Sequence, residues 1–167
     1  GYLYFRDSKL HSEYMGTVTI DPHHPDWQGA RRRTNNTAEL TALMEIIKRA
    51  LQAHAGTPME IRYDSTYAAK VAQGLITPKS HLLLVAKLRH LFITYTSRAQ
   101  ITMTHVRAHK GERWNERVDV LAKHGAALGY NTEQETVADN LRQWFKRNSA
   151  WQQCSESNVV NEYVSQR

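Results

Sequence analysis

Four carboxylates stand at the ends of predicted strands and helices, and one histidine stands in a loop ahead of the last of them. Asp7 and Asp64 each close a strand-like run, whereas Glu39 lies in the first turn of a predicted helix. Asp119 lies in the first turns of another helix, behind a loop that carries His109. Carboxylates that meet at one edge of a sheet repel one another until divalent cations neutralise them. Oxygen ligands favour Mg²⁺ or Mn²⁺, and two such ions about 3.5–4 Å apart promote phosphodiester hydrolysis.

Each of these carboxylates also has a structural interpretation that requires no chemistry. Asp7 suits a turn at the end of a strand, and Asp64 suits the N-cap of the short helix that follows it. Glu39 stands three residues after Asn36, which is the spacing of a capping box. Asp119 would be a solvated charge at the rim of its helix. The spacing of the four residues leaves both interpretations open.

The periodicity of apolar residues predicts the elements that must position these side chains. Leu40, Leu43 and Ile47 form one core-facing stripe of a helix, and the run from 59 to 64 alternates as a strand does. Strands mixed with helices in this way favour one mixed sheet with helices on its faces. The predicted order is strands over 1–7, 14–20 and 27–34, a helix from 35, a strand over 59–64, helices over 65–74 and 84–95, a strand over 101–106 and a helix over 115–128.

The composition changes after Gly129. An apolar stripe predicts one amphipathic helix over 133–148, and the residues that follow form a loose polar tail. We therefore divide the chain into a domain over 1–129 and a C-terminal extension over 130–167.

The bulk composition indicates a globular protein with a basic surface. Its 167 residues are 41% hydrophobic and 23% charged, and no apolar run approaches the length of a membrane span. The net charge is +6 and the arginines cluster at 31–33, which suits either a polyanionic partner or a merely soluble surface. The single cysteine, Cys154, excludes an internal disulfide framework and is consistent with the intracellular location that we expect.

Three stretches resemble the ribonuclease H family of the bacterial and retroviral-reverse-transcriptase kind, over about residues 1–128. They are RTNNTAEL at 33–40, YDSTYA at 63–68 and, most specifically, HVRAHKGERWNERVDVLA at 105–122. The resemblance implies a ribonuclease H-like α/β fold, with a five-stranded mixed sheet of three antiparallel and then two parallel strands and with helices on both faces. It also implies cleavage of the RNA strand of RNA–DNA hybrids by two Mg²⁺ ions, which Mn²⁺ can replace, to leave 5′-phosphate and 3′-hydroxyl ends.

The resemblance also assigns roles to individual residues. Family members have Asp-Gly-Ser after the first strand, whereas this chain has Asp7 followed by Ser and Lys. The implied metal ligands are Asp7, Glu39, Asp64 and Asp119, with His109 assisting proton transfer or release of product and metal. The implied substrate contacts are Arg32 and Thr34 to a DNA-strand phosphate, Asn35 and Asn36 in the minor groove, and Thr66 in place of a longer glutamine.

Two settings and two rival functions follow from the same residues. The domain would be a free enzyme or one part of a larger polyprotein that also contains a polymerase. The main rival is a catalytically weak or inactive module that binds hybrids or acts as a scaffold in a larger assembly. A related transposase or integrase would also cluster carboxylates on such a sheet, but the stretches at 33–40 and 105–122 favour ribonuclease H.

Overall fold

The chain begins with a tight hairpin rather than with a strand that ends in a catalytic residue. In the computed structural model, which describes residues 1–107, 112–128 and 132–134, β1 (Tyr2–Arg6) pairs antiparallel with β2 (Lys9–Met15). The two residues between the strands, Asp7 and Ser8, have φ values of 50° and 60°. Positive φ at both positions is typical of a type I′ turn, which matches the twist of a two-stranded hairpin. The predicted second strand over 14–20 is therefore wrong in its bounds, because β2 begins at Lys9 and ends at Met15.

The third strand of this sheet comes from far along the chain. β5 (Thr132–Gln134) pairs antiparallel with the outer edge of β2, so the sheet order is β1-β2-β5. The predicted strand over 27–34 is not formed, because these residues make a loop in which the Trp27 indole donates to the Ala30 carbonyl at 2.8 Å. Residues 133 and 134 also differ from the prediction, since they belong to β5 and not to a helix. The rest of the predicted helix over 133–148 and the tail lie outside the described residues.

The second sheet contains two parallel strands. β3 (Met59–Tyr63) pairs with β4 (Ile101–His105), and the crossover between them contains α2 (Thr66–Ala72) and α3 (Leu82–Thr96). These four elements agree with the predicted pattern. No ladder of hydrogen bonds joins the two sheets among the described strands. The described residues therefore show an α/β fold with two small sheets instead of one five-stranded sheet.

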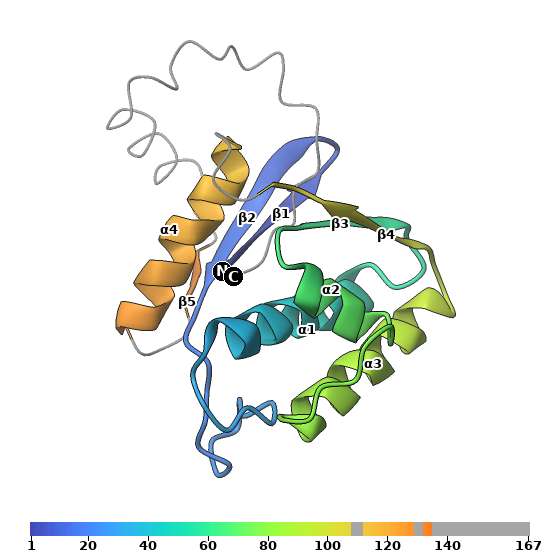
Figure 1. Cartoon of the computed structure of the whole chain (residues 1–167). Helices are drawn as coiled ribbons and strands as arrows, with labels where there is room; N and C mark the ends of the chain where they lie inside the picture. The colour runs from blue at the N-terminus through green and yellow to red at the C-terminus, as the bar shows by residue number, and fades with distance from the viewer. Residues whose placement is uncertain (108–111, 129–131, 135–167) are drawn as a thin grey trace.

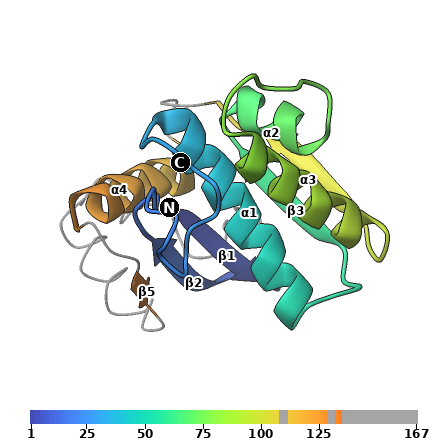
Figure 2. The ribbon, with the colours of Figure 1, turned by 90° about the horizontal axis from the view of Figure 1, so that it is seen from below.

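The longest helix, α1 (Asn35–Ala53), packs against both sheets. Its buried residues, Leu43 and Ile47 among them, share one core with Tyr2 of β1 and Ile61 of β3. Figure 2 shows α1 between the hairpin and β3, and α3 packs against α1 on the side away from the hairpin. A helix in this position ties the two sheets together through hydrophobic burial.

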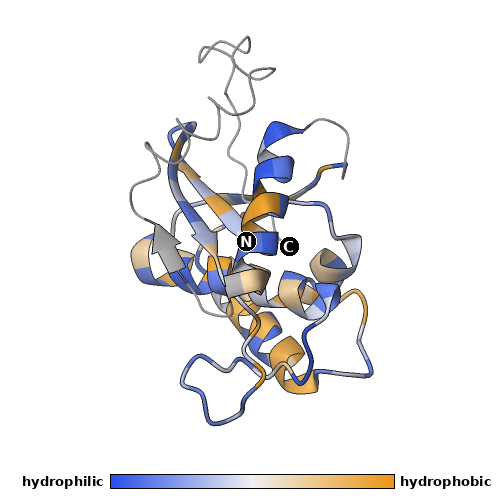
Figure 3. Ribbon diagram, turned by 90° about the vertical axis from the view of Figure 1, so that its left-hand side faces the viewer, coloured by the Kyte–Doolittle hydropathy of each residue, from blue (hydrophilic) through white to orange (hydrophobic). Residues whose placement is uncertain are grey.

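The opposite face of the hairpin is covered by α4 (Arg113–Leu128). Leu3 and Phe5 of β1 pack against Val118 and Leu121 of α4 in a second core. Figure 1 shows α4 and α1 on different sides of β1 and β2, which confirms helices on both faces of this sheet. In Figure 3 the described helices carry bands of apolar and hydrophilic residues, as helices with one buried face do. None of the described helices is long and apolar enough to cross a bilayer.

Candidate functional site

Two of the predicted carboxylates line one cavity between α1 and α4. Its volume is about 580 Å³, and Glu39 contributes from the start of α1 while Asp119 contributes from α4. The segment over 16–18, which follows β2, closes the cavity between the two helices. Glu39 is half-buried, and Asp119 is only 7% exposed. Two acidic groups that lie 80 positions apart in sequence therefore face the same cavity.

Hydrogen bonds connect a third carboxylate to this pair. The Asn115 side-chain amide donates to Asp64 Oδ2 at 3.3 Å, and Asn115 lies one turn before Asp119 on the same face of α4. The hydroxyl of Ser65, the residue after Asp64, donates to Glu39 Oε2. Glu39, Asp64 and Asp119 thus converge from α1, from the end of β3 and from α4.

The structure also excludes the capping roles considered for Glu39 and Asp64, and the burial of Asp119 excludes a solvated charge at the helix rim. The N-cap of α1 is Thr34, whose hydroxyl accepts from the Thr37 backbone in a capping box, so Glu39 does not serve the cap predicted at Asn36. Ser65, not Asp64, caps α2. Asn115, a predicted cap, lies inside α4, which begins two residues earlier.

Asp7 lies in a different place. It occupies the hairpin turn, its side chain is 92% exposed, and its nearest charge is Arg6 Nε at 4.0 Å. Asp7 lines another cavity together with Ala53 at the end of α1 and Met59 at the start of β3. The fifteen residues of α1 from Glu39 to Ala53 span about 21 Å. The structure therefore does not bring Asp7 to the other three carboxylates. The sequence could not reveal this difference, because an acid at the end of a strand and an acid in a hairpin turn follow the same kind of residue pattern.

The predicted substrate residues surround the first turns of two helices. Asn35 and Asn36 are exposed at the beginning of α1, directly after the capping residue Thr34. Thr66 is exposed at the beginning of α2, and Arg32 is exposed in the loop before α1. His109 lies outside the described residues, so its position relative to Asp119 stays a prediction.

The carboxylates fit a Mg²⁺ ion that takes only some of its ligands from the protein. Among the described residues, no three His, Cys, Asp or Glu side chains lie close enough to hold one ion together. Magnesium seldom needs such a cage, because it keeps several waters and takes one or two carboxylates together with substrate phosphate oxygens. Glu39 and Asp119 at one cavity, with Asp64 nearby, fit that mode of binding.

Three residues in this region were not predicted from the sequence. Asn115 supports Asp64, while Arg33 and Lys123 line the cavity with Glu39 and Asp119. Helical spacing is a signal for two of them, since Asn115 and Lys123 stand four residues before and after Asp119. Nothing in the arginine run distinguishes Arg33 from Arg32, because loop geometry decides which side chain faces the cavity.

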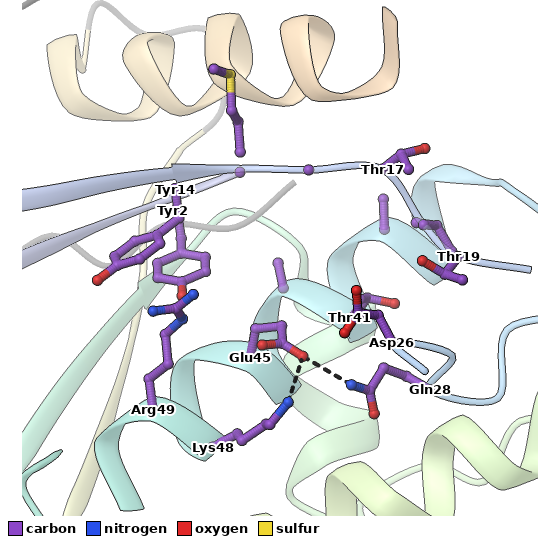
Figure 4. A pocket seen from close by; sticks show the side chains of 16 residues that line it. Tyr2, Tyr14, Thr17, Thr19, Asp26, Gln28, Thr41, Glu45, Lys48 and Arg49 are labelled. Carbon is purple, nitrogen blue, oxygen red and sulfur yellow. Dashed lines mark hydrogen bonds and ion pairs between the residues drawn. The ribbon is translucent and has the colours of Figure 1, made fainter. Parts of the chain in front are cut away.

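A third cavity shares the segment over 16–18 with the carboxylate site. Its volume is about 380 Å³, and none of the predicted site residues lines it. Figure 4 shows the side chains of Gln28 and Lys48 both reaching Glu45, at 3.1 and 3.6 Å. Arg49 lies over the ring of Tyr14 at 4.2 Å. Several charges of this cavity are therefore engaged with one another or with an aromatic ring.

Comparison with known protein families gave a match that covers most of the chain. The sequence model of the RNase H family matches residues 10–127, a range that contains Glu39, Asp64, His109 and Asp119 and begins after Asp7. Comparisons with curated proteins and with solved structures gave no match. The match covers most of the chain, and the resemblance seen in the sequence is confirmed. The chain belongs to the RNase H family, whose members are nucleases that act on RNA–DNA hybrids.

Proposed function

We propose that this protein is a Mg²⁺-dependent endonuclease that cuts the RNA strand of RNA–DNA hybrids and leaves 5′-phosphate and 3′-hydroxyl ends. The observation that carries the proposal is that Glu39 and Asp119 line one cavity while Asp64 is hydrogen-bonded to Asn115, one turn before Asp119, in a chain of the RNase H family. We propose two bound Mg²⁺ ions, for which Mn²⁺ can substitute. Asp7 is left out of the proposed ligand set because it lies at the other end of α1.

The residues around the three carboxylates hold them in position. The Asn115 amide fixes one oxygen of Asp64, and the Ser65 hydroxyl orients the carboxylate of Glu39. Bound ions would supply an activated water and would neutralise charge on the leaving oxygen. In the proposal, the imidazole of His109 moves a proton or assists release of the products, as the family resemblance implies.

The hybrid would lie across the beginnings of α1 and α2. The positive end of the α1 dipole suits a backbone phosphate, and the guanidinium of Arg32 and the hydroxyl of Thr34 are placed just before that helix. Exposed Asn35 and Asn36 offer amide groups to the minor groove, where a 2′-hydroxyl distinguishes RNA from DNA. Thr66, exposed at the start of α2, would make a shorter contact of the same kind.

One observation favours a rival function. Three carboxylates rather than the predicted four converge, because Asp7 lies in the hairpin turn. A domain that binds hybrids without cutting them would tolerate such a loss. The rival predicts tight binding of hybrid with no Mg²⁺-dependent product.

A cleavage assay with a matched pair of variants tests the proposal. Asp64→Asn removes one negative charge inside the site, and Asp7→Asn makes the same chemical change at the exposed turn. With an end-labelled RNA–DNA hybrid and Mg²⁺, we expect Asp64→Asn to cut at least about 100-fold more slowly, since metal-ion catalysis contributes several kcal/mol. Asp7→Asn should cut as the unmodified protein does, and double-stranded DNA should stay intact. Undiminished cleavage by Asp64→Asn would overturn the site, and binding without cleavage by the unmodified protein would establish the rival.

A further inference from the structure

Two basic residues also line the cavity that holds Glu39 and Asp119. Lys123 lines it one turn after Asp119 on the same face of α4, and Arg33 lines it just before α1. Arg33 alone of the three consecutive arginines lines this cavity. The cavity therefore combines a carboxylate group suited to cations with a pair of cations suited to an anion.

Arg33 is held in place by the protein. Its Nε donates to the backbone carbonyl of Val18 at 3.0 Å, and Val18 belongs to the segment that closes the cavity. One fixed donor restricts the guanidinium plane, so less conformational entropy is lost when the remaining donors bind a ligand. No hydrogen bond inside the described part of the chain uses those remaining donors.

The two cations share their cavity with the carboxylates of Glu39 and Asp119. Within the described ranges, neither Arg33 nor Lys123 forms an ion pair, whereas other basic residues of the fold do. Arg117 pairs with Glu13 and Lys48 pairs with Glu45. Once divalent ions occupy the carboxylates, Arg33 and Lys123 would be available to a bound anion.

The shape of the cavity leaves room for a nucleic-acid backbone between the two cations. The α4 residues that line it beside Lys123 are Ala122 and Ala126, which have the smallest side chains after glycine. From Asp119 to Ala126 the wall of α4 extends about 10 Å. A strand whose phosphate is attacked beside Asp119 would continue along this wall and bring its next phosphate toward Lys123.

We propose that Arg33 and Lys123 together clamp the phosphate that neighbours the scissile one on the cleaved RNA strand. The inference rests on the proposed function, because the carboxylates define where the scissile phosphate lies. The contacts implied for Arg32 and Thr34 concern the DNA strand, although Thr34 also lines this cavity. It would fix the register of the cleaved strand relative to the carboxylates without reading its sequence.

The clamp makes a quantitative prediction for the salt dependence of binding. Each neutralised phosphate of a duplex contributes a slope of about 0.9 to the fall of log affinity with log salt concentration. Arg33→Gln and Lys123→Gln remove one charge each, and Lys9→Gln removes a matched charge from the exposed start of β2, near the hairpin turn. The charge-conserving variants Arg33→Lys and Lys123→Arg control for the shape of the side chain.

Binding of a labelled RNA–DNA hybrid is measured from 50 to 200 mM salt in the Asp64→Asn background, and KM and kcat are measured in the active protein. We expect each glutamine variant to lower the slope by at most about 0.9, because both cations contact the same phosphate, with KM raised several-fold and kcat changed less than KM. Charge-conserving variants should restore the slope. The clamp is overturned if neither glutamine variant changes the slope, or if Lys9→Gln changes it equally. Because the slope needs no cleavage, failure of the clamp and failure of the nuclease assignment give different results.

Discussion

Glu13 and Arg117 form a buried, two-pronged ion pair that joins β2 to α4. Arg117 Nε and Nη2 donate to the two carboxylate oxygens of Glu13 at 2.8 and 2.7 Å, and the side chains are only 8% and 1% exposed. Arg117 stands between Asn115, which supports Asp64, and Asp119 on α4. The pair therefore sets where the helix that carries two site residues lies against the hairpin.

Removal of one partner of this pair should destabilise the fold. Arg117→Met leaves the Glu13 carboxylate buried without its charged partner, which typically costs about 3–5 kcal/mol in the free energy of unfolding. Urea denaturation followed by circular dichroism measures the change. The control is Lys48→Met, because Lys48 and Glu45 form a pair whose side chains are 43% and 28% exposed, where a loss of about 1 kcal/mol or less is expected. Equal losses for the two variants would contradict the role of burial.

Asn115→Ala should slow cleavage without unfolding the protein. The substitution removes the amide that donates to Asp64, and loss of a group that orients a metal ligand typically costs about 10–100-fold in metal affinity or activity. The measurement is kcat as a function of Mg²⁺ concentration, with the midpoint expected to shift to higher Mg²⁺. Glu116→Ala, at the next position of α4 but half-exposed, serves as the control. A normal Mg²⁺ midpoint in Asn115→Ala would show that the hydrogen bond does not orient Asp64.

Gly125→Ala should loosen the packing of α4 against the segment that follows β2. A Cβ at Gly125 would stand 2.5 Å from the backbone nitrogen of Gly16 and 2.6 Å from its oxygen, so one backbone must move. Overpacking of this kind costs about 1–3 kcal/mol in the free energy of unfolding, which a thermal melt detects. His124→Ala, at the exposed neighbouring position, should melt as the unmodified protein does. Since α4 carries Asp119 and Lys123, Gly125→Ala should also raise KM for the hybrid; a variant with unchanged melting and KM would count against this close packing.

Chelation of divalent metal should stop cleavage and spare the fold. With excess EDTA, we expect no product from the labelled hybrid, because the proposed ions supply the nucleophile and neutralise the leaving oxygen. Addition of Mg²⁺ or Mn²⁺ should restore cleavage. The far-ultraviolet circular dichroism spectrum should stay the same, since the carboxylates join elements that hydrophobic cores already hold. Persistent cleavage in EDTA would contradict the metal mechanism.

Where local patterns are strong, the sequence predicted the fold well. The helical stripe that includes Leu43 and Ile47, the strand before Asp64 and the two helices of the crossover are all present. These elements follow from hydrophobic periodicity, which depends only on neighbours in sequence. The helix starts were less accurate, because Thr34 and not Asn36 caps α1, and several polar residues in a row are chemically able to cap.

The sequence by itself determined that Glu39, Asp64 and Asp119 stand at the starts of helices and at the end of a strand, and it determined the family to which the chain belongs. Only the tertiary structure decided which acids meet. Asp7 and Asp64 follow similar strand-like runs, yet one turns a hairpin and the other lies beside Asn115. The reason is physical: convergence depends on how α1 and α4 pack on opposite faces of the hairpin, and such contacts join residues that no local pattern relates.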